Sequence, residues 1–536
     1  MSTTTGSRPK AARRRLRLSV RGLLLLVLAC GGGLGWFEHR AKVQRDSVAA
    51  IEAVKARVGY DLETDKNGVP TNRWTRWLVD VFGIDRVATV VKVYGGDYFD
   101  DAAMAAASRL TSLRKLDIVD CPVTDAGVAT GLRRLRRLES LSLYGDDGGP
   151  KLTRAIIPAV AGLRQLEELG LGIATMRLDD ADLDRLSGLT RLRDVYLGGP
   201  GITDLGMARL ARLPALADVH IEDTAVTEVG LAHLAGCKEL RHLDLDGAKA
   251  TTLEPLRNLP KMTHLLVNGC PLRTLWTSPV TGLGRLEGLI LRRMPLTDAG
   301  LEHLGELPGL KLLVLDQAGL ADAGMPWVAR CTNLETLDVA NSSITTLEPI
   351  RDMPRLKRLE AQYCPITVAW KTPPTGLDAL EQLYLDGTRV AGDGLARLGD
   401  LASVTFLTLS ESGVDDQGLR HVGSMKGLYT LFLDNTAITD AGMAGIAGMG
   451  KLSGLYLSHS AIGDASVPHL LALPGSPSIT MMRTKLTDAG LLKLALGGFR
   501  GDLHLSGPIL TKAGVQAAQD ANPGMEISVQ SGDEPR

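Results

Sequence analysis

Apolar residues recur from Leu113 onward in a fixed pattern, LxxLxL, in which buried and outward positions alternate. Such alternation over a short segment predicts a β-strand with one buried face. The copies are mostly 24 residues apart, so we predict 17 stacked copies and one terminal strand. They begin at Leu113, Leu138, Leu166, Leu192, Leu216, Leu240, Met262, Leu286, Leu310, Leu334, Leu356, Leu380, Val404, Leu428 and Leu452, with two degenerate copies at Ile479 and Leu503 and the terminal strand at Ile527 and Val529.

A second signal follows many strand starts by eleven residues and predicts the entry to a short helix. It has the form Thr-Asp-Ala-Gly, as at residues 124–127, 297–300, 439–442 and 487–490. A threonine hydroxyl can cap the first free amides of a helix, and an aspartate complements its positive end. Each copy is therefore predicted to be a strand, a turn and a short helix. One copy cannot bury its leucines alone, so neighbouring copies must stack.

These residues resemble the leucine-rich repeat (LRR) family, in its cysteine-containing type with 24 to 26 residues per copy. The chain further resembles bacterial LRR proteins with a single N-terminal membrane anchor. The resemblance implies an α/β solenoid with a parallel concave sheet, short convex helices and a concave face that binds other macromolecules. Thr388, Ser412, Thr436 and Ser460 replace the asparagine or cysteine that follows the strand in the family, which weakens the subclass assignment and leaves the fold prediction intact.

The repeat array contains an internal duplication. Residues 251–262 have the sequence TTLEPLRNLPKM, and residues 345–356 have TTLEPIRDMPRL, 94 positions later. The same offset relates Cys270 to Cys364 and Trp276 to Trp370. A block of four copies was therefore duplicated, and its simplest consequence is a longer array.

The first residues predict a membrane anchor. A basic leader (1–21) precedes an uncharged apolar segment (22–37), which ends with Trp36 and Phe37. Aromatic residues favour the membrane interface, and basic flanks stay in the cytoplasm, so the repeats are expected on the outer (periplasmic or extracellular) side. A cleaved signal with its site in residues 31–35, a lipoprotein signal using Cys30 and a buried core segment remain alternatives. The repeats of a cytoplasmic solenoid would have the same pattern.

Four further regions are predicted. Residues 38–57 have helical spacing and form a juxtamembrane helix, and the aromatic-rich residues 58–110 form an N-terminal cap, because a repeat array needs an atypical end. Residues 111–524 hold the repeats, and residues 525–536 form the terminal strand and a polar tail.

Composition excludes several classes of function. The net charge of -1 argues against a general phosphate-backbone binder, so no nucleic acid is expected, and the run Arg133 to Arg137 is interpreted as a solvated helix face. Sequence motifs of hydrolases and zinc sites are absent, so we predict no enzymatic activity, cofactor or metal. His220, Asp244, His242 and His264 are expected to cluster on the concave face; they have metal-ligand chemistry, but such residues are common on polar LRR faces.

The concave face is predicted to bind a protein through aromatic residues. Only 21 of the 536 residues are aromatic, and five fall on one face of four consecutive strands: Tyr384, Phe406, Tyr429, Phe432 and Tyr456. Aromatic side chains with a polar group dominate interface hot spots. Glu381 and Gln382 flank them. The alternative is that the rings only stack and stiffen the sheet, which would favour a structural envelope spacer without a specific ligand.

Overall fold

The computed structural model describes residues 20–63, 71–145, 152–173, 176–506 and 510–529, apart from the side chains of residues 20–30. Most of the basic leader, Cys30 and the polar tail from residue 530 therefore lie outside the description. The chain divides into two compact units. Unit 1 comprises residues 1–168 and 173–175, and unit 2 comprises residues 169–172 and 176–536. Strand β5 (Glu168–Ile173) lies at the boundary between them.

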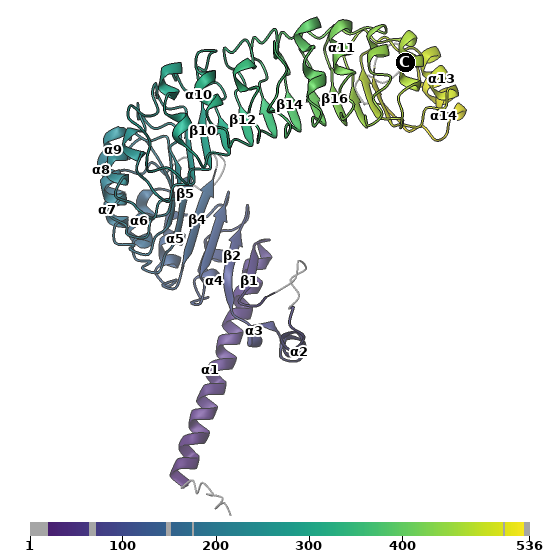
Figure 1. Ribbon diagram of the computed structural model, residues 1–536. Helices are drawn as coiled ribbons and strands as arrows, with labels where there is room; N and C mark the ends of the chain where they lie inside the picture. The colour runs from purple at the N-terminus through teal and green to yellow at the C-terminus, as the bar shows by residue number, and fades with distance from the viewer. Residues whose placement is uncertain (1–19, 64–70, 146–151, 174–175, 507–509, 530–536) are drawn as a thin grey trace, which may run out of the picture. The chain divides into compact units, whose positions relative to one another are not determined.

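Unit 1 is a small sheet with helices along the chain between its strands (Figure 1). Strand β1 pairs antiparallel with β2, whereas β2 with β3 and β3 with β4 pair in parallel. Its elements are α1 (Val20–Ala53), β1 (Arg57–Tyr60), α2 (Arg73–Phe82), α3 (Ile84–Val87), β2 (Val90–Gly95), α4 (Asp101–Ala107), β3 (Lys115–Val119), α5 (Asp125–Leu132), β4 (Ser140–Gly145), the 3-10 helix η1 (Arg154–Ile156) and α6 (Ile157–Val160).

Helix α1 is continuous through the predicted anchor and most of the predicted juxtamembrane helix. Its second half buries Ala41, Val48 and Ile51. Gln44, also buried, donates from Nε2 to the Ala88 carbonyl at 2.9 Å and accepts from the Val90 N–H at 3.2 Å. The buried amide therefore joins α1 to the start of β2. Within the described part of the chain, no helix is long and apolar enough to cross a membrane.

Strand β2 adds a parallel strand ahead of the predicted copies. Val90 and Val93 are fully buried in the positions of the first two leucines, while Gly95 takes the third. A Cβ on Gly95 would lie 2.7 Å from Cγ of Phe99, which is buried in the space that a leucine would fill. The aromatic side chain thus replaces the missing leucine, and the antiparallel β1 covers the free edge of β2.

Unit 2 contains the remaining copies as one parallel ladder in which each strand from β6 to β20 pairs with the next. Helical segments follow the strands along the opposite side of the unit (Figure 1). The strands are β6 (Asp194–Gly198), β7 (Asp218–Glu222), β8 (His242–Asp244), β9 (His264–Asn268), β10 (Gly288–Arg292), β11 (Leu312–Val314), β12 (Thr336–Asp338), β13 (Arg358–Glu360), β14 (Gln382–Tyr384), β15 (Phe406–Thr408), β16 (Thr430–Phe432), β17 (Gly454–Tyr456), β18 (Ser478–Met482), β19 (Leu503–Ser506) and β20 (Ile527–Val529).

The helical segments of unit 2 are a mixture of α-helix and 3-10 helix. The two 22-residue copies use only 3-10 helix, and so do the 24-residue copies that begin at Leu286, Leu380 and Leu428. The α-helices are α7 (Asp180–Leu186), α8 (Asp204–Leu210), α9 (Glu228–Leu234), α10 (Met325–Ala329), α11 (Asp416–Val422), α12 (Val467–Leu471), α13 (Asp488–Leu496) and α14 (Lys512–Ala521). The 3-10 helices are η2 (Glu254–Leu256), η3 (Asp298–Leu301), η4 (Leu304–Glu306), η5 (Glu348–Ile350), η6 (Gly392–Leu395), η7 (Leu398–Asp400), η8 (Gly442–Gly445) and η9 (Asp464–Ser466).

The predicted leucine core is confirmed. Leu380, Leu383 and Leu385 of one copy are fully buried, whereas Gln382 and Tyr384 between them are half-buried and outward-facing. Complete burial of one leucine contributes about 2 kcal/mol. Strands β3 to β20 include an apolar position of every predicted copy, which confirms the α/β solenoid.

The Thr-Asp-Ala-Gly signal has a second role that links neighbouring copies. Thr227 caps α9, as predicted for its residue type, by accepting from the Val229 N–H at 3.2 Å. Asp204 of the preceding copy accepts from the Thr227 N–H at 2.7 Å, the Thr227 hydroxyl at 2.8 Å and the Gly230 N–H at 2.9 Å. We call this arrangement the carboxylate clasp. The same aspartate–threonine pair recurs in both units, at Asp101–Thr124, Asp125–Thr153, Asp180–Thr203, Asp322–Thr345, Asp416–Thr439, Asp464–Thr487 and Asp488–Thr511.

The glycine of the signal leaves room for the clasp. A Cβ on Gly230 would lie 2.5 Å from Oδ1 of Asp204, and one on Gly490 would lie 2.1 Å from Oδ1 of Asp464. Contacts below 3.0 Å require displacement of the carboxylate that satisfies the backbone amides. In the signal, the threonine therefore caps the helix and the aspartate accepts the hydrogen bonds of the clasp. The alanine separates them from the glycine, which leaves room for the carboxylate of the neighbouring copy.

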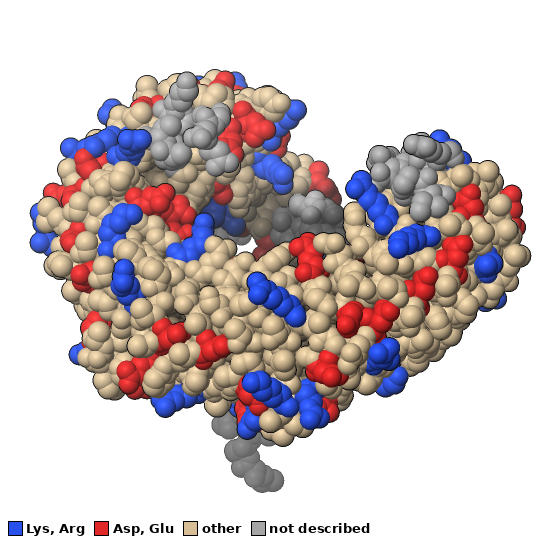
Figure 2. Space-filling view, turned by 90° about the horizontal axis from the view of Figure 1, so that it is seen from above, with Lys and Arg blue, Asp and Glu red and all other residues tan. Residues whose placement is uncertain are grey.

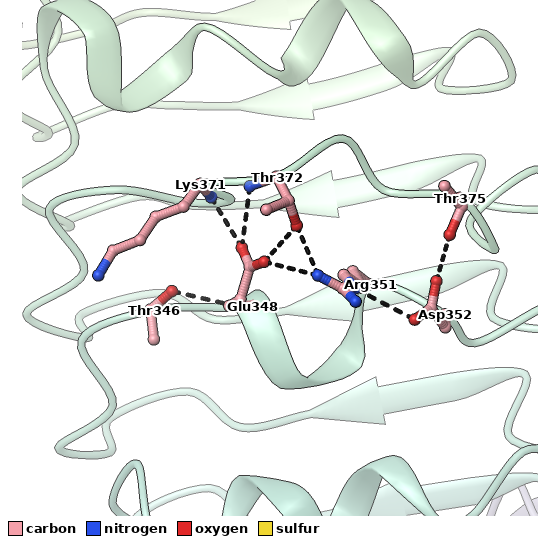
Figure 3. A network of polar contacts seen from close by, with 7 residues as sticks. All are labelled: Thr346, Glu348, Arg351, Asp352, Lys371, Thr372 and Thr375. Atoms are coloured by element: carbon pink, nitrogen blue, oxygen red, sulfur yellow. Dashed lines mark hydrogen bonds and ion pairs between the residues drawn. The ribbon is translucent and has the colours of Figure 1, made fainter.

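The duplicated TTLEP segment makes a related contact with glutamate (Figure 3). Glu348 accepts from the Lys371 N–H at 2.7 Å, from the Thr372 hydroxyl and from Arg351 at 3.0 Å. Thr346 caps η5 by accepting from the Glu348 N–H at 3.2 Å. In the duplicate, Glu254 accepts from the Thr277 N–H at 2.8 Å and from Arg257. The duplication therefore preserves an inter-copy contact.

Replacement of Glu348 by glutamine is expected to remove an acid-sensitive part of the stability. Partial burial would raise the pKa of Glu348, but hydrogen bonds from Thr372, Lys371 and Arg351 outweigh it and lower the pKa from 4.5 to about 2. A depressed carboxyl pKa stabilises the fold above the unfolded pKa and loses that effect as pH falls from about 4.5 towards 2. We expect E348Q to cost about 1–2 kcal/mol at pH 7, after allowance for solvent screening, and nearly nothing near pH 2.

Urea unfolding of the two proteins at pH 7, pH 4 and pH 3 measures this difference. Glu302 is exposed, and its carboxylate has no hydrogen bond within the described residues, so E302Q is the control and should behave as the parent chain does. A constant difference between E348Q and the parent across this pH range would contradict the ionic role of Glu348.

Candidate functional site

Four aromatic side chains form a continuous row on the outward face of β14 to β17. The ring centroids are 5.2 Å apart for Tyr384 and Phe406, 5.4 Å for Phe406 and Phe432, and 4.0 Å for Phe432 and Tyr456. The last pair is parallel-stacked, with an interplanar angle of 8°. Each ring covers part of its neighbour, and so all four are half-buried. We call these four residues the aromatic row.

The register of the sheet brings these residues together. Tyr384, Thr408, Phe432 and Tyr456 occupy one column of directly paired positions across β14 to β17. Phe406 lies in the adjoining column, paired with Gln382 and Thr430, as the sequence predicts. Because Thr408 is small, the ring of Phe406 can contact Phe432 across the gap between columns.

Arg358 extends the row at its N-terminal end, and the sequence analysis missed it. Its guanidinium carbon lies 4.4 Å from the centroid of the Tyr384 ring, a cation–π contact. Glu360 at 2.7 Å and Gln382 at 2.7 Å accept its hydrogen bonds. Partial burial raises the pKa of Tyr384, so this hydroxyl stays protonated and donates to Gln382 at 3.3 Å. Arg358 lies in the same column of the sheet as Gln382 and Phe406, and this register could have predicted its place beside the row.

Tyr429 stands apart from the row. It precedes β16, is 57% exposed and has no ring contact within the described residues. Its backbone accepts from the Ser453 N–H and the Gly454 N–H, which fixes its position beside the row. Of the five predicted residues, the structure therefore brings four into ring contact and leaves Tyr429 as a separate exposed side chain.

A ladder of aspartate and serine supports the turns that follow the aromatic row. Asp386 accepts from the Ser410 N–H at 2.8 Å, and Asp434 accepts from the Ser458 N–H at 2.6 Å. The Ser410 hydroxyl accepts from the Asp434 N–H at 3.1 Å, which connects the two pairs. Burial raises the pKa of both carboxyl groups. The strands that carry the row therefore end in turns whose backbone N–H groups are hydrogen-bonded to these side chains.

The histidine cluster of β7 to β9 forms as predicted, but two of its histidines pair with carboxylates of the same cluster. His242 contacts Asp218, and Nδ1 of His220 lies 3.7 Å from Asp244. The hydrogen bond to Asp244 raises the pKa of His220, whereas desolvation and the neighbouring His242 lower that of His264. Within the described residues, no three His, Cys, Asp or Glu side chains converge on a possible metal position. The carboxylates instead bind imidazoles.

The described cysteines are buried and unpaired. Cys270 donates to the Leu245 carbonyl at 3.1 Å, and Cys364 donates to the Val339 carbonyl at 3.3 Å. Burial raises the pKa of Cys270 to about 12 and that of Cys121 to about 11. These thiols are therefore turn-filling groups, and their thiolate forms are disfavoured.

Unit 1 has a basic groove beside α1. A cavity of about 830 Å³ is lined by Arg40, Arg114, Arg136 and Arg137 and by the acidic Asp61 and Glu139, and a second of about 620 Å³ shares Arg40, Arg136 and Arg137. The run from Arg133 to Arg137 was predicted to lie on a helix. That prediction was wrong: α5 ends at Leu132, because Leu135 and Leu138 turn into the core. The arginines project from the turns that result.

The charged surface elsewhere is mixed. On the face in Figure 2, Lys and Arg alternate with Asp and Glu in small groups, without a broad area of one sign among the described residues. Binding to extended polyanions requires aligned positive charge. This face therefore offers no support for nucleic-acid binding.

A comparison of the sequence with family models agrees with the repeat pattern. A sequence model of the leucine-rich repeat matches residues 109–130, which contain β3 and the first Thr-Asp-Ala-Gly signal up to α5. The sequence matches no curated relative. Similar solved structures include an internalin of Listeria monocytogenes (18% identity, covering 76% of this chain and 93% of that chain, TM-score 0.39) and an LRR protein of Leptospira interrogans (17% identity, 66% and 95%, TM-score 0.44).

The chain thus has the fold of a leucine-rich repeat solenoid. The evidence is the parallel strands at the repeat interval, the buried LxxLxL leucines and the matched repeat. On this fold, the chain carries the carboxylate clasp and the aromatic row on β14 to β17.

Proposed function

We propose that this protein is a non-catalytic, membrane-attached LRR module that binds a protein partner through the aromatic row. The observation that supports this function is the unbroken series of ring contacts from Tyr384 to Tyr456, extended by the Arg358 guanidinium. Aromatic and arginine side chains are the residue types enriched at interface hot spots. A half-buried row has already lost much of its side-chain entropy, so a partner meets a preorganised surface.

The membrane attachment in this proposal is supported by the sequence of the N-terminus. Residues 1–21 are basic, and residues 22–37 are uncharged and end in Trp36 and Phe37. The positive-inside rule then puts the N-terminus in the cytoplasm and the repeats on the outer side of the membrane. The competing function is a structural envelope spacer in which the rings only stiffen the sheet.

A crosslinking capture experiment tests the binding function. The bait is the full chain in detergent, incubated with native envelope extract, beside a variant with Tyr384, Phe432 and Tyr456 changed to alanine. A second variant, L205A and V229A, removes exposed apolar side chains from α8 and α9 and serves as the control. Circular dichroism verifies the folding of each bait.

We expect a partner that the parent chain and the control capture and the triple variant loses. Equal capture by all three baits would contradict binding through the aromatic row, and no capture by any of them would favour the spacer. The triple variant changes the aromatic row, and the control changes α8 and α9. A loss of capture by the triple variant alone is therefore assigned to the row and not to a general loss of folding.

A further inference from the structure

Helix α2 exposes an apolar face that no described residue covers. None of its ten residues is buried. The exposed fractions are 75% for Trp74, 52% for Trp77 and 54% for Val81, with Leu78 and Phe82 also exposed. Exposed apolar side chains in such a group mark a contact surface.

The apolar residues of α2 occupy one side of the helix. Trp74, Trp77, Leu78, Val81 and Phe82 recur at intervals of three and four residues, and Arg73, Arg76 and Asp80 take the opposite side. The helix is well defined at both ends. Asn72 accepts from the Trp74 N–H at 2.9 Å, and Gly83 stops the helix with a φ of 81°. A short helix with aromatic residues on one side and arginines on the other has the pattern of a helix that lies in a membrane interface.

Arg86 fixes the end of α2 beside the end of the predicted membrane segment. Its guanidinium donates to both carboxylate oxygens of Glu38 at 3.0 Å and to the Phe82 carbonyl at 3.0 Å. Glu38 is the first charged residue after the apolar segment 22–37, and Phe82 is the last residue of α2. A second ion pair, between Arg45 of α1 and Asp85 of α3 at 3.4 Å, also joins these two helices. Figure 1 shows α3 beside α1, with α2 next to α3.

The surroundings of this junction complement a phospholipid surface. On α1, Leu34 and Trp36 are 66% and 64% exposed, immediately before Glu38. The basic groove begins there as well, because Trp36, His39 and Arg40 line it. Within the described residues, its Arg134, Arg136 and Arg137 have no ion-pair partner. Positive charge next to exposed tryptophans fits lipid phosphates above an acyl layer.

We propose that α2 lies in the interface of a lipid bilayer, with Trp74, Trp77, Leu78 and Val81 among the acyl chains and Arg73 at the headgroups. This inference rests on the proposed membrane attachment, since it uses the bilayer that residues 22–37 would enter. Unit 1 would then contact the bilayer at two places, the apolar segment and α2. Two contacts restrict the tilt of the unit against the membrane, which a single helix leaves free.

A solvent-sensitive fluorophore tests the depth of α2. The full chain, with Cys30 changed to serine, carries one introduced cysteine at Leu78 on the apolar side or at Asp80 on the polar side. The described native cysteines are buried, so the fluorophore reacts with the introduced thiol. A third position, Val229 on α9, is 60% exposed and controls for unspecific adsorption. Each protein is reconstituted into vesicles of phosphatidylcholine and phosphatidylglycerol, and flotation measures attachment separately.

We expect a blue shift of the label at position 78 in vesicles and no shift at positions 80 and 229. Flotation together with an unshifted label at position 78 would overturn the α2 proposal while retaining the membrane attachment. Absence of flotation would overturn both. A shift at position 78 that grows with protein concentration in vesicle-free detergent would identify a second copy of the chain as the occupant and would overturn the lipid proposal.

Discussion

Asp204→Ala is expected to lower the free energy of unfolding around α8 and α9 by about 3 kcal/mol. The carboxylate accepts hydrogen bonds from three donors, two on Thr227 and one on Gly230, and alanine provides no acceptor for any of them. Thr227 is half-buried and Gly230 is buried, so water replaces the lost acceptor poorly. In a repeat protein, such a loss acts mainly on the interface between adjacent copies.

Amide hydrogen exchange measures this effect locally, because a chain of this length need not unfold in one step. A loss of about 3 kcal/mol corresponds to roughly 100-fold faster exchange in β7 and β8. Asp204→Asn should recover part of the loss, since its amide oxygen still accepts. Glu302→Ala removes a carboxylate without a hydrogen bond and should leave exchange unchanged. Equal exchange in D204A and E302A would contradict the clasp.

Phe432→Ala is expected to weaken partner binding by about 100-fold, and Tyr429→Ala by less than about 10-fold. Phe432 contacts Phe406 on one side and Tyr456 on the other, whereas Tyr429 has no ring contact within the described residues. Loss of the Phe432 ring separates Tyr456 from the other two rings of the row. The partner recovered in the capture experiment is titrated against each variant to measure the two affinities.

The order of the two effects decides the role of the row. A larger loss for Y429A would mean that the exposed tyrosine carries binding and that the row only supports the sheet. Thermal unfolding of both variants accompanies the titration. Removal of a half-buried phenylalanine costs stability, and an affinity loss is assigned to the interface only where the variant remains folded.

The repeat strands could be predicted because each needs three buried leucines in one face, which leaves a direct trace in the sequence. Strand β2 could not be predicted in the same way. Its third buried position is Gly95, and the side chain that fills the space, Phe99, lies outside the strand. The clasp was also missed. Its aspartate satisfies the local helix rule on its own, so nothing within one copy indicates the bond to the next.

The columns of the candidate site could be predicted from the sequence, as the repeat strands could. Alternation within strands and the constant register gave the neighbours Tyr384, Phe406, Phe432 and Tyr456. The contact of Arg358 depends on the length and rotamer of a flexible side chain, which the pattern does not specify. Tyr429 precedes the first residue of β16, so the alternation within the strand does not fix the direction of its side chain.

The carboxylate clasp also gives the array a direction. Each acceptor aspartate binds a threonine that lies later in the chain, from Asp101 with Thr124 to Asp488 with Thr511. During synthesis, a copy that carries such an acceptor therefore emerges before the threonine that binds it. At Thr511 the signal changes from Thr-Asp-Ala-Gly to Thr-Lys-Ala-Gly, so Lys512 stands where the next acceptor would be. Arg154 takes the same position after Thr153, and further copies follow it, so the loss of one acceptor does not end the array.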